Sequence, residues 1–440
     1  MSRTLKNYLP ALAAFFFLFL IGCKDDKPDS IPSPTPSPNP VFKLEKVSGD
    51  NQVGFPGQPL ANPIKIKLLN QAGAPDANKF VDFIVASGNG SLSTSKIITD
   101  QNGEAEVTWV LGMAASTQSV KAYILDANNQ PVSSTVAEFT AKFKAVTVAG
   151  GNGIGSSTNQ LNYPGSVFVD ANGNVFVADT DNHRIQKWAP GQTSGVTVAG
   201  GNGAGSGANQ LDFPLGVFVD ANGNIFVADF NNHRIQKWVP GQTSGVTVAG
   251  GNGSGFAANQ LNYPVSVFVD TNGNIFIADY FNDRIQKWAP GATMGVTVAG
   301  GNGDGFAPNQ LSAPNSVFVD KNGNIFVADT DNHRIQKWAS GATSGVTVAG
   351  GNGSGFAANQ LNTPASVFVD ANGNIFIADY NNDRIQKWAP GAGTGVTVAG
   401  GKGTGTAPDQ VSRPSSVFVD ANGNIFVADT FNHRIQKWLP

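Results

Sequence analysis

A block of twelve residues, VADTDNHRIQKW at positions 177–188, combines side chains that could do chemistry. Its Asp, His and Arg could act as a general acid, a general base or a metal ligand. The block returns with small changes at 227, 277, 327, 377 and 427. The block can be interpreted in two ways, as a functional site present six times or as a structural unit present six times.

The histidine of the block alternates with aspartate among the copies, as His183, His233, Asp283, His333, Asp383 and His433. Zinc or copper needs three or four such ligands at about 2.0–2.2 Å. Units arranged in a ring would hold these positions far apart, and the chain has only these 4 histidines. We therefore expect a structural role for this position, with no metal and no cofactor.

The other repeated residues also suit structural roles. Asp179 precedes the link between two expected strands and Arg184 follows it, so an ion pair would pin the link. Asp170 precedes an Asn-Gly turn and is expected to accept hydrogen bonds from the turn amides. Trp188 recurs too regularly for a ligand site and is expected to pack between units.

These residues belong to a repeat with a strict period of 50 residues, from 146 to 440. Each copy offers four strands, which in the first copy are expected at 166–170, 174–179, 184–188 and 196–199. A period of this length with several short strands indicates a β-propeller. The first VTVA run, 146–149, precedes every other strand, and no such run follows Trp438. It should therefore complete the last blade and close the ring.

The repeated pattern PxSVFVDxNGNIFVADTxNHRIQKW is very similar to the NHL repeat. The similarity covers about two thirds of the chain. It implies a six-bladed propeller over residues 145–440, in agreement with the strand count. Some NHL propellers are metal-dependent lyases with channel histidines, but this chain has no histidine beyond those of the repeat.

The charge balance argues against nucleic acid as a partner. The chain has a formal net charge of −3, and the repeats hold 15 Lys and Arg against 19 Asp. The RNA-binding use of NHL propellers requires a basic face.

The N-terminus predicts a lipoprotein. Residues 1–22 contain a short basic start and an apolar run that ends in Leu-Ile-Gly before Cys23, the only cysteine. This resembles a bacterial lipobox, which implies lipidation of Cys23 and a membrane anchor. The Lys-Asp-Asp that follows resembles the signal that sends lipoproteins to the outer face of the outer membrane. Residues 23–41 are rich in proline and predict an extended tether.

Residues 42–144 show short alternating runs separated by turn signals, typical of a β-sandwich of about seven strands. The run FVDFIVASGNGSLSTSKIITDQNGEAEVTWVLG, from Phe80, resembles bacterial Ig-like modules of invasin-type surface proteins. The resemblance implies a spacer or stalk, with Trp109 in its core.

The positions at which the six copies differ point to a binding face. Most of the chemically diverse positions fall in two connections that share one face of a propeller. The candidate ligand-binding residues are Tyr163, Phe213, Phe230, Tyr263, Tyr280, Phe281, Tyr380, Arg413 and Phe431. Exposed aromatics beside Asn and Asp suit glycans or peptides; alternatively, these rings only pack against the loops.

The sequence thus predicts an all-β, monomeric binding or scaffold lipoprotein of the cell envelope, exposed at the surface. The NHL propeller would recognise a protein or a carbohydrate. The alternative is a propeller enzyme of the envelope, a lyase or hydrolase that could depend on a metal. We identify no catalytic residue.

Overall fold

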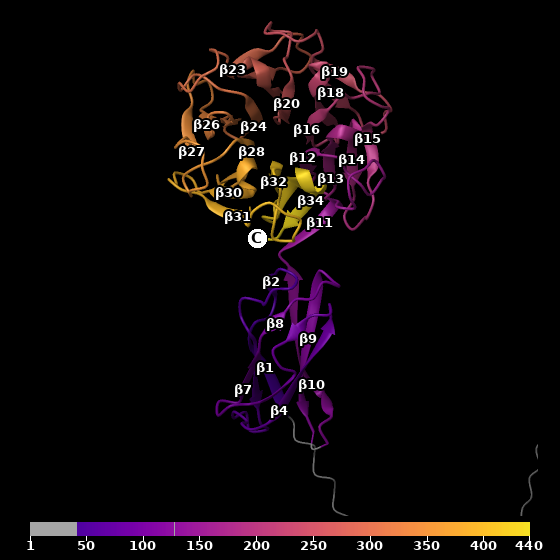
Figure 1. The fold of residues 1–440 in the computed structure, drawn as a ribbon, viewed down its shortest axis with the longest axis vertical. Coiled ribbons are helices and arrows are strands. Elements are labelled where there is room, and N and C mark those ends of the chain that lie inside the picture. Colours follow the sequence, from indigo (N-terminus) through magenta and orange to yellow (C-terminus); the bar gives the residue numbers. More distant parts are fainter. Residues whose placement is uncertain (1–41, 127) are drawn as a thin grey trace, which may run out of the picture.

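The computed structural model describes residues 42–126 and 128–440, whose regular secondary structure is almost entirely β-strand. Figure 1 shows two bodies, a ring of small sheets and an elongated unit below it. No helix in the described part of the chain is long and apolar enough to cross a membrane. Cys23, the signal segment and the tether lie outside the described residues, so these assignments stay predictions.

The N-terminal unit is a β-sandwich of a three-stranded sheet (β1-β3-β7) and a five-stranded sheet (β2-β10-β9-β4-β6), with β5 and β8 as a small extra pair. Its strands are β1 Lys43–Ser48, β2 Gln52–Gly54, β3 Ile64–Leu69, β4 Phe80–Ser87, β5 Ser91–Leu92, β6 Lys96–Ile98, β7 Glu104–Val107, β8 Trp109–Val110, β9 Thr117–Leu125 and β10 Pro131–Phe143. The expected seven strands become ten because several runs break into pieces of two or three residues.

The sandwich core follows the alternation of the sequence. In β3 every second residue is buried, and Ile64, Ile66 and Leu68 face the opposite sheet. Trp109 is fully buried in the same cluster, as expected. The resemblance to Ig-like modules stays a prediction.

The repeats form six four-stranded antiparallel sheets, the blades of a propeller. The blades are: one, β12 Pro164–Val169, β13 Val175–Asp179, β14 Arg184–Trp188, β15 Val196–Gly200; two, β16 Pro214–Val219, β17 Ile225–Asp229, β18 Arg234–Trp238, β19 Val246–Gly250; three, β20 Pro264–Val269, β21 Ile275–Asp279, β22 Arg284–Trp288, β23 Val296–Gly300; four, β24 Pro314–Val319, β25 Ile325–Asp329, β26 Arg334–Trp338, β27 Val346–Gly350; five, β28 Pro364–Val369, β29 Ile375–Asp379, β30 Arg384–Trp388, β31 Val396–Gly400; six, β32 Pro414–Val419, β33 Ile425–Asp429, β34 Arg434–Trp438, β11 Ala145–Gly150.

Two local features differ from the sequence expectation. The innermost strand starts at Pro164 rather than 166, and residue 165 forms a bulge opposite β13. The link after the second strand is a single 3-10 turn in five blades: η1 Thr180–Asn182, η2 Phe230–Asn232, η3 Tyr280–Asn282, η4 Tyr380–Asn382 and η5 Thr430–Asn432. Both features recur at the same end of the blades, so that end has a uniform backbone.

The ring is closed by the strand that precedes all blades. β11 pairs antiparallel with β34, with Ala145 opposite Trp438 and Gly150 opposite Arg434. The sixth blade therefore contains both ends of the repeat region, as the strand count indicates. This arrangement leaves no blade without its outer strand.

Each blade buries its faces only against its neighbours. The cluster between blades one and two joins Ile185 and Ala199 of blade one to Leu211, Val227 and Trp238 of blade two. Equivalent clusters lie at each of the five remaining blade junctions. The repeated tryptophans therefore pack between blades, as expected.

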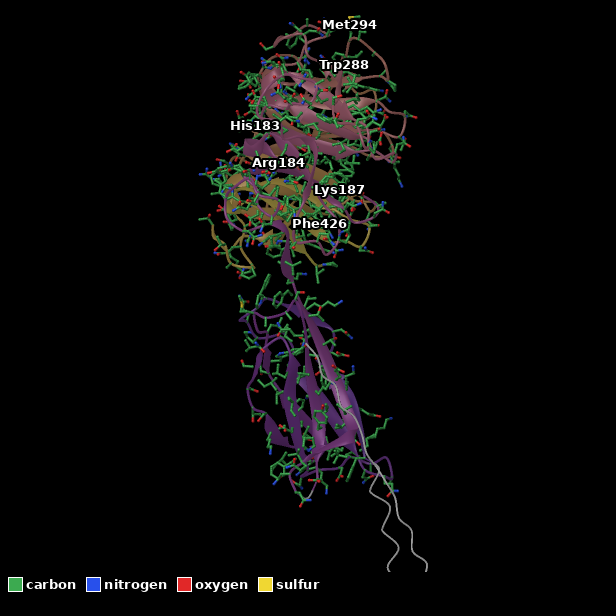
Figure 2. All side chains as sticks on the ribbon, turned by 90° about the vertical axis from the view of Figure 1, so that its right-hand side faces the viewer. His183, Arg184, Lys187, Trp288, Met294 and Phe426 are labelled. Atoms are coloured by element: carbon green, nitrogen blue, oxygen red, sulfur yellow. The ribbon has the colours of Figure 1, made fainter. Side chains whose placement is uncertain are left out.

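The two faces of the propeller have different roles in the repeat. In Figure 2, which views the ring edge-on, His183 and Arg184 lie towards one face and Lys187 and Phe426 towards the other. We call the first the loop face, because the 3-10 links and the long glycine-rich loops end there. On the opposite, hairpin face, Asp170 accepts the N–H groups of Asn172 and Asn174 at 2.9 and 2.8 Å, as predicted.

The sandwich joins the propeller with almost no linker. Only Lys144 separates β10 from β11, and its N–H donates to the carbonyl of Gly54 at 2.7 Å. The Phe55 ring meets the edge of Trp438, with centroids 5.6 Å apart, and packs into the cluster between blades five and six. The sandwich thus abuts the closing blade at the rim of the ring (Figure 1).

We predict that the propeller unfolds in a single cooperative transition only when β11 is present. A fragment of residues 145–440 should show one cooperative thermal transition. A fragment of residues 151–440 lacks the outer strand of blade six and should melt at least roughly 10 °C lower. Calorimetry of both fragments checks this, and identical melting curves would contradict the closure.

Candidate functional site

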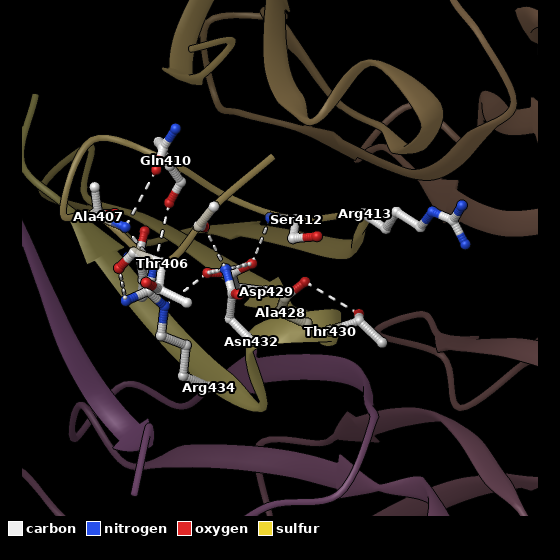
Figure 3. Close-up of polar contacts among 12 residues, drawn as sticks. Thr406, Ala407, Gln410, Ser412, Arg413, Ala428, Asp429, Thr430, Asn432 and Arg434 are labelled. Atoms are coloured by element: carbon white, nitrogen blue, oxygen red, sulfur yellow. Dashed lines mark hydrogen bonds and ion pairs between the residues drawn. The ribbon is translucent and has the colours of Figure 1, made fainter. Parts of the chain in front are cut away.

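A buried ion pair holds the loop end of every blade. In blade six, Arg434 Nε donates to Asp429 Oδ2 at 2.6 Å, and the Asp429 side chain is fully buried (Figure 3). The N–H of Ser412 and the amide of Asn432 also donate to Asp429, at 2.6 and 2.9 Å. The equivalent pairs in the other blades span 2.6–2.7 Å, as predicted from sequence.

The arginine of each pair also ties down the long loop. In blade six its remaining N–H groups donate to the carbonyls of Thr406, Ala407 and Gln410 at 2.9, 3.3 and 3.2 Å. Burial raises the pKa of Asp429, and Arg434 opposes that rise. Three donors on the carboxylate and four acceptors around the guanidinium satisfy both buried charges. These Asp and Arg residues are structural, and none of them lines the cavity of about 660 Å³ at the centre of the propeller.

The alternating His/Asp position makes one contact in all six blades. His183 Nδ1 accepts the N–H of Phe213, in the next blade, at 3.1 Å. Asp283 Oδ1 accepts the N–H of Ala313 at 2.9 Å in the same place. The remaining copies repeat this bond at 2.7–3.2 Å. Histidine and aspartate alternate because either can accept one hydrogen bond.

This contact requires neutral histidine with an unprotonated Nδ1. Desolvation by burial lowers the pKa of His233 and of His433, which favours that state. The structural role expected for the position is confirmed. Within the described residues, no group of three or more His, Cys, Asp or Glu side chains is placed to hold a metal.

The axis of the propeller is narrowed by a ring of six phenylalanines. Neighbouring centroids lie 5.0–5.2 Å apart around the complete circle of Phe168, Phe218, Phe268, Phe318, Phe368 and Phe418. In a regular hexagon of this side length each centroid lies about 5 Å from the axis, so the six rings narrow the centre of the propeller.

Towards the loop face, a cavity of about 660 Å³ receives residues from all six blades. Its floor contains the bulge residue that follows each innermost proline. This residue differs in every blade: Gly165, Leu215, Val265, Asn315, Ala365 and Ser415. The next residue is serine in five blades, and its hydroxyl accepts an N–H of the following blade at four junctions, at 3.2–3.4 Å.

The six unlike floor residues were missed in the sequence analysis. The signal was present, because aligning the copies shows this position to be different in all six. The expected strand begins at 166, so residue 165 falls between that strand and the long loop, and the sequence does not mark it as a bulge. Bulges re-aim side chains beside functional sites, and here they turn six different side chains into one cavity.

The predicted aromatic residues gather around this cavity in two groups. Phe213, Phe230, Tyr263, Phe281 and Tyr280 form a continuous chain of ring contacts with centroids 4.7–6.1 Å apart. All but Tyr263 line the cavity, and Tyr263 supports Phe230 and Phe281 from behind. This group covers blades two and three.

The second group spans blades five, six and one. Tyr163 meets Phe431 edge-on at 5.3 Å, and Tyr380 lies on the same wall. Arg413 is not among the residues that line the cavity; its guanidinium lies 4.8 Å from the Phe431 centroid and 5.9 Å from that of Tyr380, beside the rim. Between the groups, blade four presents only Ala313, Thr330 and Asp331. The wall is therefore uneven, although the backbone is sixfold.

A larger cleft, of about 970 Å³, lies between blades three and four on the side of the hairpin turns. Most of its lining is repeated from blade to blade, and Thr271, Lys321 and Ser340 are the clearest exceptions. A site for one ligand needs unlike residues, so the loop-face cavity is the candidate site.

The family model for the NHL repeat matches residues 161–188, 211–238, 311–338 and 412–438. Each match runs from the end of the long loop through the third strand of a blade. Four of the six blades thus match the NHL repeat, and blades three and five carry the same repeated pattern. No curated protein matches the chain.

Solved structures share the fold at low identity. A protein of unknown function from Bacteroides thetaiotaomicron is 14% identical, with a TM-score of 0.53 over 92% of this chain and 99% of that one. An auxiliary nutrient binding protein from the same organism is 12% identical, with a TM-score of 0.55 over 90% and 97%. A streptogramin B lyase is 12% identical at a TM-score of 0.40 over 90% and 97%, which is too distant to support an argument.

The His/Asp contact predicts an unusual pattern of substitution effects. His233→Asp should leave the free energy of unfolding nearly unchanged, because Asp283 and Asp383 already fill this role. His233→Leu should cost about 1–3 kcal/mol, because it leaves the N–H of Tyr263 without its acceptor. Chemical denaturation of the full chain measures both, and equal losses would refute the interpretation.

Proposed function

We propose that the chain is an envelope lipoprotein whose NHL propeller binds a carbohydrate in the loop-face cavity. The observation that supports this most directly is the set of six unlike residues on the cavity floor. The sixfold frame of the propeller does not require six different residues at one position. Recognition of one asymmetric ligand would require them.

The shape of the cavity favours a small ligand or the end of a glycan over a folded protein. Its volume of about 660 Å³ lies within the range of small-molecule sites. The ring of six phenylalanines narrows the axis beneath it, so ligand would enter and leave through the loop face. A protein partner would instead use a wide, continuous surface.

The lining chemistry suits sugars. Phe281 is 58% exposed and Tyr280 lies against it, which leaves a broad aromatic surface for the apolar face of a pyranose. Asn315, one of the six floor residues, has a side-chain amide with no hydrogen-bond partner among the described residues. The hydroxyls of Thr180 and Ser415 also line the cavity, although both already donate to backbone carbonyls.

The sandwich would present this cavity away from the membrane. Phe42, the first described residue, lies beside Thr135, eight residues before the end of β10 at the propeller. This separation corresponds to roughly 25 Å of strand. With lipidation at Cys23, the tether and the sandwich would act as a spacer, and the cavity would open sideways from it. The nutrient-binding function named for one structural neighbour agrees with this role.

We predict that Phe281→Ala weakens carbohydrate binding about tenfold, because it removes an aromatic platform from the rim. The probe is p-nitrophenyl β-D-glucoside, titrated by calorimetry against the full chain. Phe256→Ala is the matched control: this ring is 57% exposed but stacks on Arg284 in the same blade, outside the cavity lining.

Both substitutions remove an exposed ring, so their melting temperatures should be similar. Loss of binding in the Phe281 variant alone supports the site. Equal binding by both variants, or no binding of any glycan by the native chain, would reject the proposed function.

A further inference from the structure

Arg413 differs from every other arginine of the described chain. The other six each donate to a fully buried aspartate at 2.6–2.7 Å. Arg413 is exposed, and no carboxylate of the described residues lies within 4.0 Å of its charged nitrogens. Figure 3 shows its side chain pointing away from the Asp429 network.

The position of Arg413 is fixed by the same bond that fixes its equivalents. Its backbone N–H donates to Asp383 Oδ1 at 2.7 Å, and its φ is +48°. In other blades this place holds Tyr163, Phe213 or Tyr263 beside the cavity rim. The backbone thus aims residue 413 at the rim, and blade six puts a cation where blades one to three put a ring.

The guanidinium of Arg413 also lies against two aromatic rings. Its central carbon lies 4.8 Å from the Phe431 centroid and 5.9 Å from the Tyr380 centroid, and both rings line the cavity. Stacking on aromatic rings restricts the planar group while its N–H donors stay free. The result is an oriented fork of donors beside the cavity.

The nearby acids do not neutralise this fork. Asp383 uses one oxygen on the backbone N–H of Arg413. The one carboxylate among the described residues of the cavity lining is Asp181 of blade one, and burial raises its pKa. Blades two and three offer aromatic rings with Leu215 and Val265 on the floor. The cavity therefore has an apolar side in blades two and three, and Arg413 stands as a cation beside its rim across the axis.

We propose that the cavity is specific for acidic carbohydrates, with Arg413 pairing with the carboxylate of a uronate and the aromatic side holding the apolar part of the ligand. A carboxylate matches the planar fork of arginine through two parallel hydrogen bonds. This inference rests on the proposed function and adds the class of glycan to it.

The test compares p-nitrophenyl β-D-glucuronide with p-nitrophenyl β-D-glucoside, which differ only by a carboxylate in place of a hydroxymethyl group. Calorimetry with the full chain should give about tenfold tighter binding of the glucuronide at low salt. Arg413→Gln should remove this preference and leave glucoside binding within about twofold. Arg413→Lys should retain only part of it, because lysine lacks the fork.

Lys402→Gln is the control for a general loss of charge, since Lys402 lies in the same long loop but, unlike Arg413, does not lie against a ring of the cavity lining. It should leave the preference intact. Equal affinities of the native chain for the two glycosides, or a preference that survives in Arg413→Gln, would overturn the inference alone. Failure of both glycosides to bind would overturn it together with the proposed function.

Discussion

The buried Asp–Arg pair at the loop end of each blade is the interaction on which the rest of the propeller depends. It joins the second and third strands, and its guanidinium holds three carbonyls of the long loop. Removing one partner would leave the other as an unpaired buried charge, at a cost of about 3–5 kcal/mol. Because the loops are fixed in this way, the residues that follow them reach the axis in the same place in every blade.

This frame explains how a sixfold molecule can hold an asymmetric site. The His/Asp contact and the serine hydroxyls join neighbouring blades, and the phenylalanine ring narrows the axis. None of these joints depends on what stands at the bulge or at the left-handed position before the proline. Those two positions and the 3-10 link are free to differ, and all three contribute to the cavity or its rim.

Most of the frame could be predicted from the sequence, because its signals are local and repeated. The Asn-Gly turns, the spacing of Asp179 and Arg184, and the unpaired first strand determine the blades and their closure. The cavity floor could not be located in this way. A bulge depends on the pairing between two strands. The residues next to Gly165 or Asn315 in the sequence do not indicate that the strand register shifts there. Arg413 is among the candidates expected from the sequence, but only the structure shows that the other six described arginines are paired with buried aspartates.

Residues that are the same in all six blades build the propeller, and residues that differ between blades bind the proposed ligand. This division is tested most directly by giving blade three the variable residues of blade four, as Tyr263→Ala, Val265→Asn, Tyr280→Thr and Phe281→Asp in one full-length variant. The account predicts a melting temperature within a few degrees of the native chain, because every joint of the frame is kept, and more than tenfold weaker binding of p-nitrophenyl β-D-glucoside. Unchanged binding, or a variant that no longer folds, would contradict it.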